Sequence, residues 1–303
     1  MINYSVIIPQ RNSLETLPRL FQSIPRREDI EIILVDNSAD PINKDQLLIK
    51  RDFKLLTSAP LRYAGGARNV GLENARGKWI LFADADDFFP IGAFDVFDSY
   101  LSSSYDLIYF ESESVYDDTL EKSGRSVMFN NHIDAFLRAD ESEERCRLSY
   151  LVPWGKMIRK DLIDKHNIFF DEVLAANDVV FATKVGYYAK SFHADNRITY
   201  IITTRRGSLS NRWDYPVIES RFYAAIRRNK FLKEKGIEGY QSSIMIYLYK
   251  SLRYGAHKCF RLLFIAIKNR QNIFVGLSHW AESYKRIHSS EKKNKAYIVS
   301  KGE

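Results

Sequence analysis

Apolar residues follow two alternating patterns along the first part of the chain. Short continuous apolar runs, typical of buried strands, are separated by segments in which apolar residues recur every three or four positions, the spacing of one helix face. The first such helix is expected over 13–24, with Ser13 as its N-cap. A strand, a helix and a strand within about 30 residues form a βαβ unit, which predicts a parallel α/β sheet of the nucleotide-binding type. The predicted strands are 4–8, 31–35, 53–56, 78–83 and 106–110.

The elements that follow are less regular. Gly77 is well placed to end a helix that we expect over 66–75. The section 112–150 is polar and charged, so we expect an insertion or a helical excursion that is not part of the sheet. Order returns at 152–158 and in a strand at 197–203.

The chain is expected to have two regions, an α/β domain over 1–215 and an all-helical region over 216–303. The balance of basic and acidic residues also changes near this boundary. Residues 1–220 hold 27 Lys and Arg against 33 Asp and Glu, whereas 221–303 hold 18 against 5. An acidic body and a basic tail are expected to meet different partners.

Composition limits the class of protein. With 303 residues, 45% of them hydrophobic, the chain is long enough to bury a large core. Cys146 and Cys259 are far apart and outside any metal spacing, which indicates a reducing compartment and no disulfide framework. The chain begins with a strand pattern instead of a signal peptide, and no apolar run reaches the roughly 18 residues of a membrane span. We therefore expect a cytoplasmic protein.

Polar clusters follow three of the predicted strands, and ligands of open α/β sheets bind at the carboxyl ends of parallel strands. The clusters are Pro9-Gln10-Arg11-Asn12, Asp36-Asn37-Ser38 and Asp84-Ala85-Asp86-Asp87. Three carboxylates within four residues repel one another unless a cation lies among them, and oxygen ligands of this kind suit Mg²⁺ or Mn²⁺ bridging phosphate oxygens. The alternative is a solvated turn in which Asp87 caps the next helix.

Several motifs in order resemble the signature of glycosyltransferase family 2. The resemblance is dense over 3–90 and resumes at 152–210. It implies a GT-A fold, a Rossmann-like mixed sheet flanked by helices, here with a C-terminal helical extension. It also implies an inverting transfer from a nucleotide sugar, with a donor half over about 1–110 and an acceptor half over about 111–215. The motifs are Val6-Ile7-Ile8-Pro9, Val35-Asp36-Asn37, Gly65-Gly66-Ala67-Arg68-Asn69-Val70-Gly71, Ala75-Arg76-Gly77-Lys78-Trp79-Ile80-Leu81-Phe82 and the acidic cluster.

The resemblance assigns roles to residues on the donor side. Pro9 and Asp36 would line the base and ribose pocket of a donor such as a UDP-sugar, with Arg11 nearby. Arg68 would approach the base or diphosphate, the alternative being a surface arginine. Asp84 would touch the nucleotide.

The same resemblance places a divalent metal, Mn²⁺ or Mg²⁺, on Asp86, where it would assist departure of the nucleotide diphosphate. For Asp87 two roles stay open, a cap of the following helix or a residue that supports the metal-binding side chain. Arg205, before Arg206-Gly207-Ser208, would belong to a basic loop that closes over the diphosphate.

A transfer to a hydroxyl needs a general base. Family members carry a Glu-Asp pair where this chain has Asn177-Asp178, so Asp178 matches the base and Asn177 departs from the pattern. The alternative for Asp178 is an ordinary N-cap. In Pro153-Trp154-Gly155-Lys156, similar to the acceptor-side segment, Trp154 would offer a face for a sugar ring and Lys156 would lie beside it. A core tryptophan is the equal alternative.

The basic tail carries a predicted amphipathic helix over 244–268. Such a helix fits an anionic membrane surface and hence a glycan or lipid-linked saccharide acceptor, whereas the alternative is a helix packed on the catalytic domain. Basic residues recur on one face at three- and four-residue steps, with one gap: Lys250, Arg253, His257, Arg261 and Lys268.

Other functions remain open at this level. A metal-dependent nucleotidyltransferase also uses carboxylates on an α/β sheet, but it is typified by a Gly-rich basic loop after the first strand, where this chain has Pro9-Gln10-Arg11-Asn12. Nucleic-acid binding through the tail is disfavoured by the acidic body. A relative without activity is a further alternative because of Asn177. The residues do not identify the sugar, the acceptor or the oligomeric state.

Overall fold

The computed structural model describes residues 1–47, 49–205 and 212–275. The chain forms two compact units. One contains 1–173 with 177–204, and the other contains 174–176 with the chain from Arg205 onward.

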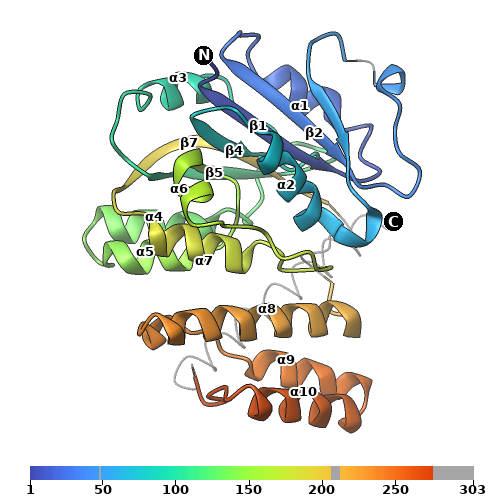
Figure 1. The fold of residues 1–303 in the computed structure, drawn as a ribbon, viewed down its shortest axis with the longest axis vertical. Coiled ribbons are helices and arrows are strands. Elements are labelled where there is room, and N and C mark those ends of the chain that lie inside the picture. The colour runs from blue at the N-terminus through green and yellow to red at the C-terminus, as the bar shows by residue number, and fades with distance from the viewer. Residues whose placement is uncertain (48, 206–211, 276–303) are drawn as a thin grey trace. The chain divides into compact units, whose positions relative to one another are not determined.

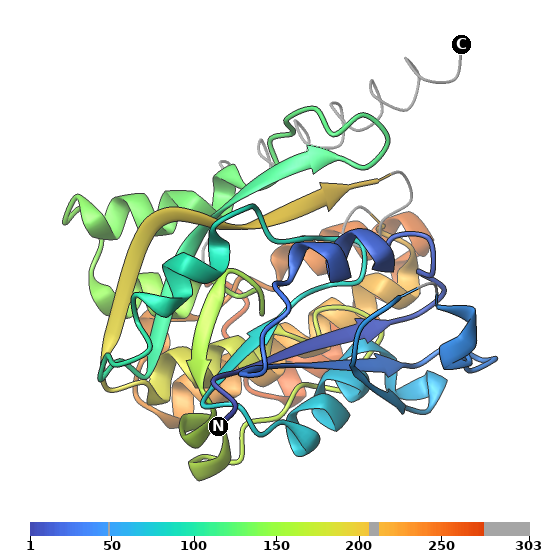
Figure 2. The same ribbon diagram turned by 90° about the horizontal axis from the view of Figure 1, so that it is seen from above.

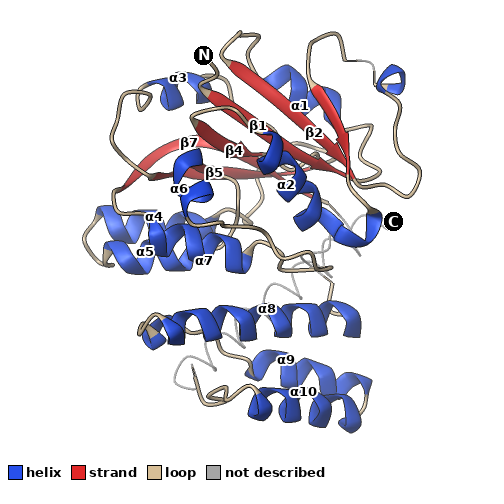
Figure 3. Cartoon of the chain, viewed as in Figure 1, coloured by secondary structure: helices blue, strands red, loops and turns tan. Residues whose placement is uncertain are grey.

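The first unit is built on one seven-stranded mixed sheet (Figures 1 and 3), with the strand order β3-β2-β1-β4-β6-β5-β7. Strands β1 to β4 are parallel to one another, β6 runs antiparallel to both of its neighbours, and β5 and β7 are parallel. The apolar runs predicted as strands lie in this sheet. The strands are β1 (Tyr4–Gln10), β2 (Ile30–Asp36), β3 (Lys54–Thr57), β4 (Trp79–Phe82), β5 (Leu107–Tyr116), β6 (Lys156–Arg159) and β7 (Phe192–Thr204).

Helices cover both faces of the sheet. The strand order reverses between β1 and β4, so right-handed crossovers place α1 and α2 on opposite faces (Figure 1). The helices of this unit are α1 (Leu17–Ser23), α2 (Tyr63–Asn74), α3 (Ala93–Asp98), α4 (Val127–Leu137), α5 (Glu143–Ser149), α6 (Lys160–Lys165) and α7 (Val179–Tyr188), with 3-10 turns at Lys44–Gln46 and Pro60–Arg62.

Two expected helix ends are wrong. Helix α1 begins at Leu17, not after Ser13, whose hydroxyl instead donates to the Arg11 carbonyl. Pro18 accounts for the later start, because proline favours the first helical turn. Helix α2 ends at Asn74, and Gly77 lies against β1, where an added Cβ would come within 2.5 Å of the Ser5 nitrogen. Gly77 therefore serves close packing and not a helix cap.

The section 112–150 was expected outside the sheet, and its first residues contradict this. Strand β5 continues to Tyr116, paired with β7 from Ser112↔Tyr200 to Tyr116↔Thr204 after a register shift near Glu111. Figure 2 shows β7 bending along its length. The alternation of polar and apolar residues in β5 is that of a strand with one accessible face, which explains why it resembled a polar insertion. The rest of the section does contain the expected helices, α4 and α5.

The second unit is helical throughout its described part, as predicted. It contains α8 (Tyr215–Glu234), α9 (Met245–Ser251) and α10 (Ala256–Lys268), with 3-10 turns at Glu238–Tyr240 and Leu252–Tyr254. Within the described ranges, no helix has the length and apolar character needed to cross a membrane. The helices share a core formed by Ile218, Phe222, Ala225, Ile226, Ile244, Leu248, Leu262 and Ala266.

The single basic helix face expected over 244–268 is wrong. Gly255 adopts φ +104°, a conformation that favours glycine, and it separates α9 from α10. Lys250 does not share a face with Lys268, because it is 1% exposed and its ammonium lies 5.0 Å from the Trp213 ring centroid. Arg253 lies in the 3-10 turn between the two helices, and the other basic residues of the pattern lie in α10.

Candidate active site

The polar clusters gather where the strand order reverses. Strand β1 has β2 on one side and β4 on the other, so the residues that follow these strands meet at one edge of the sheet. Gln10 is opposite Asp36 in the register, and its Nε2 donates to Asp36 Oδ1 at 3.1 Å. The first two clusters are therefore in direct contact at this edge.

The acidic turn, residues 84–87, is tied to β7 by Asp87. This side chain is 3% exposed and accepts hydrogen bonds from the Thr203 backbone N–H (2.7 Å) and the Tyr200 hydroxyl (2.9 Å). Burial and the neighbouring Asp86 and Asp84 raise the pKa of Asp87 well above its ordinary value. Because α3 begins at Ala93, the helix-cap alternative for Asp87 is wrong.

The backbone of the acidic turn is also held from the α1 side. Thr16 Oγ1 donates to the Ala85 carbonyl at 2.8 Å, and Arg19 Nη2 donates to the Asp86 carbonyl at 2.7 Å. The hydroxyl of Thr203 reaches the same Asp86 carbonyl. The turn is thus fixed through its carbonyls and Asp87, while the side chains of Asp84 and Asp86 stay partly exposed.

Arg68 connects the acidic turn with the segment of the predicted base. It lies on α2, is 5% exposed, and donates to Asp84 Oδ1 at 2.6 Å and to Asn177 Oδ1 at 2.8 Å. Its guanidinium also lies 5.3 Å from the Phe170 ring centroid. The surface-arginine alternative is therefore wrong.

Helix α2 packs closely on the segment 170–172, a contact that the sequence did not reveal. An added Cβ at Gly65 would come within 2.0 Å of the Asp171 carbonyl oxygen, so only glycine allows this approach. Asn69 exchanges two hydrogen bonds with the backbone of Phe170, at 2.8 and 3.0 Å. In the sequence, this contact was indicated only by the motif Gly65 to Gly71. The motif contains Gly65 and Asn69 but does not show which residues they contact.

Asp178 stands at the start of α7, half-buried. Asp178 occupies the N-cap position of α7, as the alternative expected. Among the described residues, however, no α7 backbone N–H donates to its carboxylate, so the side chain does not cap the helix. Burial raises the pKa of Asp178, Arg68 and Lys156 act in the opposite direction, and Asp84 adds to the rise. The predicted base and the acidic turn therefore lie within electrostatic reach of each other.

Trp154 and Lys156 are core residues in this structure. Trp154 is 3% exposed and stacks on Tyr200 with 5.5 Å between ring centroids. Lys156 is also 3% exposed, and its ammonium donates to the Tyr150 carbonyl at 2.6 Å and faces the Tyr109 ring at 4.5 Å. Burial lowers the pKa of Lys156 to about 7, against the attraction of Asp178. The core alternative thus describes Trp154, and direct contact of either residue with an acceptor stays a prediction.

The other predicted donor residues occupy different environments. Pro9 is buried within β1, whereas Arg11 is exposed just beyond its end. Asp36 is 1% exposed, and its carboxylate accepts from the backbone N–H groups of Ser38 (2.9 Å) and Ile42 (2.7 Å) as well as from Gln10. Arg205 directly follows β7 and is exposed, while the rest of its loop, 206–210, lies outside the described residues. Their roles in donor binding stay predictions.

The carboxylates fit a metal that takes most of its ligands from a substrate. In the described chain, no group of three or more His, Cys, Asp or Glu side chains is arranged to hold a metal by itself. Asp87 is buried against β7, whereas Asp84, which is paired with Arg68, and Asp86 are both partly exposed. Sites with one or two carboxylates are typical of Mg²⁺ bound to phosphates.

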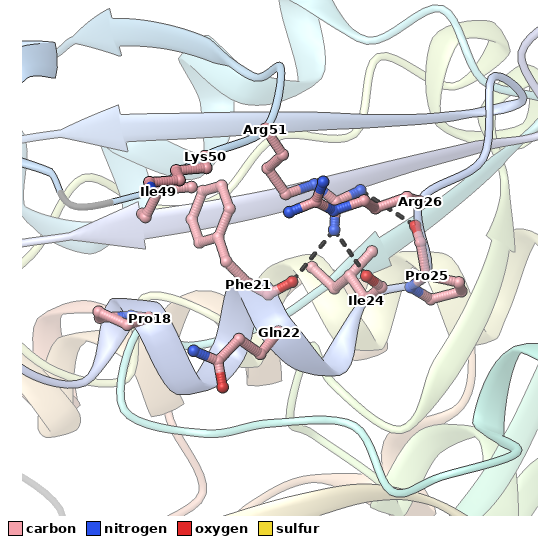
Figure 4. Close-up of a pocket in the computed structure, with 9 residues that line it drawn as sticks. All are labelled: Pro18, Phe21, Gln22, Ile24, Pro25, Arg26, Ile49, Lys50 and Arg51. Carbon is pink, nitrogen blue, oxygen red and sulfur yellow. Dashed lines mark hydrogen bonds between the residues drawn. The ribbon is translucent and has the colours of Figure 1, made fainter.

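A separate pocket lies beside the C-terminal end of α1 (Figure 4). Arg51 is among its lining residues, and its guanidinium donates to the carbonyls of Phe21 (3.1 Å), Ile24 (2.6 Å) and Pro25 (3.0 Å). These contacts tie Arg51 to the last turn of α1 and to the two residues that follow it. We assign this pocket a structural role, distinct from the acidic turn.

Comparisons with known proteins agree on one group. The family model described as Glycosyl transferase family 2 matches residues 5–166. The poly(ribitol-phosphate) beta-N-acetylglucosaminyltransferase TarS of Staphylococcus aureus is 24% identical over 219 residues, which cover 68% of this chain and 36% of that protein. The putative glycosyltransferase EpsH of Bacillus subtilis is 23% identical over 230 residues, covering 72% of this chain and 65% of EpsH.

Solved structures share the fold. S. aureus TarS 1–349 in complex with UDP-GlcNAc superimposes with a TM-score of 0.59 at 20% identity, covering 86% of this chain and 76% of that one. The mannosyltransferase PcManGT of Pyrobaculum calidifontis, in complex with GDP-Man and Mn²⁺, gives a TM-score of 0.54 at 15% identity, with 98% and 85% covered. The mixed sheet flanked by helices is the GT-A fold of these transferases.

Proposed function

The chain belongs to glycosyltransferase family 2, and we propose that it moves a sugar, with inversion, from a nucleotide-diphosphate sugar to a hydroxyl group of a glycan or lipid-linked acceptor. The relatives named above are glycosyltransferases, which removes the support for a nucleotidyltransferase or a nucleic-acid-binding protein. Because the chain spans about a third of the length of TarS, the acceptor of TarS is not carried over to this chain.

A UDP-sugar is the donor that we propose. TarS structures contain UDP-GlcNAc and UDP, and their fold is shared. Within the described residues, Asn37 Nδ2 and Ser58 Oγ are buried without hydrogen-bond partners, at the carboxyl ends of β2 and β3. Buried polar groups are normally paired, so a nucleoside bound at this edge would supply partners that the protein lacks.

Asp86 is the residue that would hold a divalent metal, Mn²⁺ or Mg²⁺. When bound, such a cation neutralises charge on the departing nucleotide diphosphate. The protein prepares this position by fixing the backbone of the turn from both sides, through Arg19 and Thr203. Asp84, held by Arg68, would lie beside the nucleotide.

The observation that carries the proposal is the position of Arg68 between Asp84 and Asn177, next to Asp178. It joins the donor turn to the proposed base in one site. Asp178 would accept the proton of the acceptor hydroxyl as that oxygen attacks the sugar. Its raised pKa makes it a stronger base than an exposed aspartate, because a base is most effective when its pKa approaches the working pH.

The test separates donor binding from transfer. We expect one nucleotide sugar to raise the thermal unfolding temperature of the protein with Mn²⁺ present. Asp86→Ala should abolish this metal-dependent rise. Asp178→Asn should keep it and lower transfer by at least about a hundredfold. Asp52→Asn, an exposed acid outside the site, is the matched control and should change neither. Full transfer by Asp178→Asn would remove Asp178 as the base, and metal-dependent stabilisation of Asp86→Ala would remove Asp86 as the ligand.

A further inference from the structure

Helix α10 has two faces of different character. Leu262 and Ala266 are fully buried in the core of the helical unit. Phe260, Phe264 and Ile267 are 68%, 68% and 62% exposed. At 3.6 residues per turn, positions 260, 264 and 267 lie on one arc of the helix, opposite the buried pair. Three large apolar side chains are therefore turned outward by the same packing that buries the inner face.

Basic residues border this outward arc. At about 100° per residue, His257, Arg261 and Lys268 follow the three apolar positions around the helix, and all three are exposed. Helix α10, with the sequence AHKCFRLLFIAIK, contains no acidic residue. Arg261 pairs with Glu219 at 3.1 Å but remains 55% exposed. The arc thus combines an apolar stripe with a cationic edge.

We propose that the outward arc of α10, defined by Phe260, Phe264, Ile267, Arg261 and Lys268, docks on an anionic lipid surface. Helices that lie in a membrane interface insert large apolar residues among the acyl chains and keep Lys and Arg at the level of anionic headgroups. The arc offers both groups side by side on an exposed helix. The proposal is independent of the donor chemistry and of Asp178.

Charge distinguishes lipid from other occupants. A symmetric contact with a second copy through this arc would place the basic edges of both helices in one interface with no acidic residue of α10 to balance them. Three side chains also offer far less than the roughly 800 Å² per partner of a stable interface. A nucleic acid would neutralise the basic edge but would leave the apolar stripe in water. An anionic bilayer matches both parts.

Vesicle sedimentation of the full chain tests the proposal. We expect binding to vesicles of equal parts phosphatidylglycerol and phosphatidylcholine and little binding to phosphatidylcholine alone. Replacing Phe260, Phe264 and Ile267 together by Ser should weaken binding about a hundredfold, since large apolar side chains that enter the acyl region contribute most of the insertion energy. Lys268→Glu should weaken it about tenfold, because it reverses a charge near the headgroups.

Matched controls lie on exposed positions of the sheet unit. Ile91→Ser, at a fully exposed isoleucine, and Lys190→Glu, at an exposed lysine, should bind as the wild type does. All variants should keep the wild-type unfolding temperature, since the changed side chains are exposed. Equal binding by the triple variant and the wild type overturns the proposal. So does wild-type self-association that the triple variant loses without any vesicle binding, which would identify a second copy as the occupant.

Discussion

Arg68 and Asp84 form an ion pair with 2.6 Å between guanidinium nitrogen and carboxylate oxygen, and the arginine is almost completely buried. The second arm of the guanidinium reaches Asn177, 109 residues later in the chain. Two segments that carry different halves of the proposed reaction are thus held by one side chain. Because Asn177 is neutral, the positive charge of Arg68 is paired directly with the carboxylate of Asp84.

Arg68→Lys should separate geometry from charge. A lysine keeps the positive charge but cannot present two parallel donors, so it cannot hold Asp84 and Asn177 together. We expect transfer to fall about a hundredfold, since two charge-assisted hydrogen bonds contribute about 3 kcal/mol. Arg62→Lys is the control, because the Arg62–Glu172 pair is exposed and should contribute less than about 1 kcal/mol. Steady-state transfer rates that are equal in the Arg68 variant and the wild type would contradict this role.

Asn177→Glu should move the pH dependence of transfer. The base must be a carboxylate, and the pKa of Asp178 is raised, so activity is lost as pH falls through that raised pKa. A second carboxylate at 177 would raise the pKa of Asp178 further by like-charge repulsion, and the acidic limb should shift to higher pH. Asn177→Gln has the size of glutamate without its charge and should leave the limb in place. A pH–rate profile of kcat/KM measures the shift; an unmoved limb in Asn177→Glu would argue that another group titrates.

Gly65→Ala should destabilise the fold strongly. Its Cβ would meet the Asp171 carbonyl oxygen at 2.0 Å, and backbone cannot move aside as a flexible side chain can. Overpacking of this kind costs about 1–3 kcal/mol or more. Gly124→Ala is the matched control, since an added Cβ there has no neighbour within 4 Å among the described atoms. Urea unfolding gives the comparison, and equal free energies of unfolding for the two variants would show that α2 tolerates a shift.

Lys156 should leave a signature in the pH dependence of stability. Its pKa is lowered to about 7 in the folded protein from an ordinary 10.5, so between these values the unfolded chain binds more protons and stability rises with pH. The free energy of unfolding of the wild type should therefore gain about 1 kcal/mol per pH unit relative to Lys156→Met across this window. Lys190→Met, at an exposed position, should run parallel to the wild type. A wild-type curve parallel to that of Lys156→Met would mean that the buried ammonium keeps its ordinary pKa.

The sheet and the location of the site could be predicted from the sequence. Buried strands appear as continuous apolar runs, and the polar residues after them must meet where parallel strands end. What could not be predicted is the partner of each polar side chain. Arg68 and Asn177 come together only when α2 and the segment before α7 pack on the sheet, and Asp87 and Thr203 only when β7 has joined it.

Burial was the other property that the sequence did not reveal. Trp154 and Lys156 follow an irregular segment, and their residue types suit a sugar-binding surface as well as a core. The aromatic rings of Tyr109, Tyr150 and Tyr200, from separate parts of the chain, decide that both are enclosed. In the tail, Lys250 matched a helical period that Gly255 then interrupts.

The anchoring of Asp87 to β7 has a practical consequence for anyone who trims this protein. Tyr200 and Thr203 lie beyond residue 166, where the family match ends. A gene fragment cut at that residue would encode the whole acidic turn but none of the groups that satisfy its buried carboxyl, and an unsatisfied buried polar group costs a few kcal/mol. The shortest piece worth expressing therefore extends at least to Thr204, and an inactive shorter piece would say nothing about the enzyme.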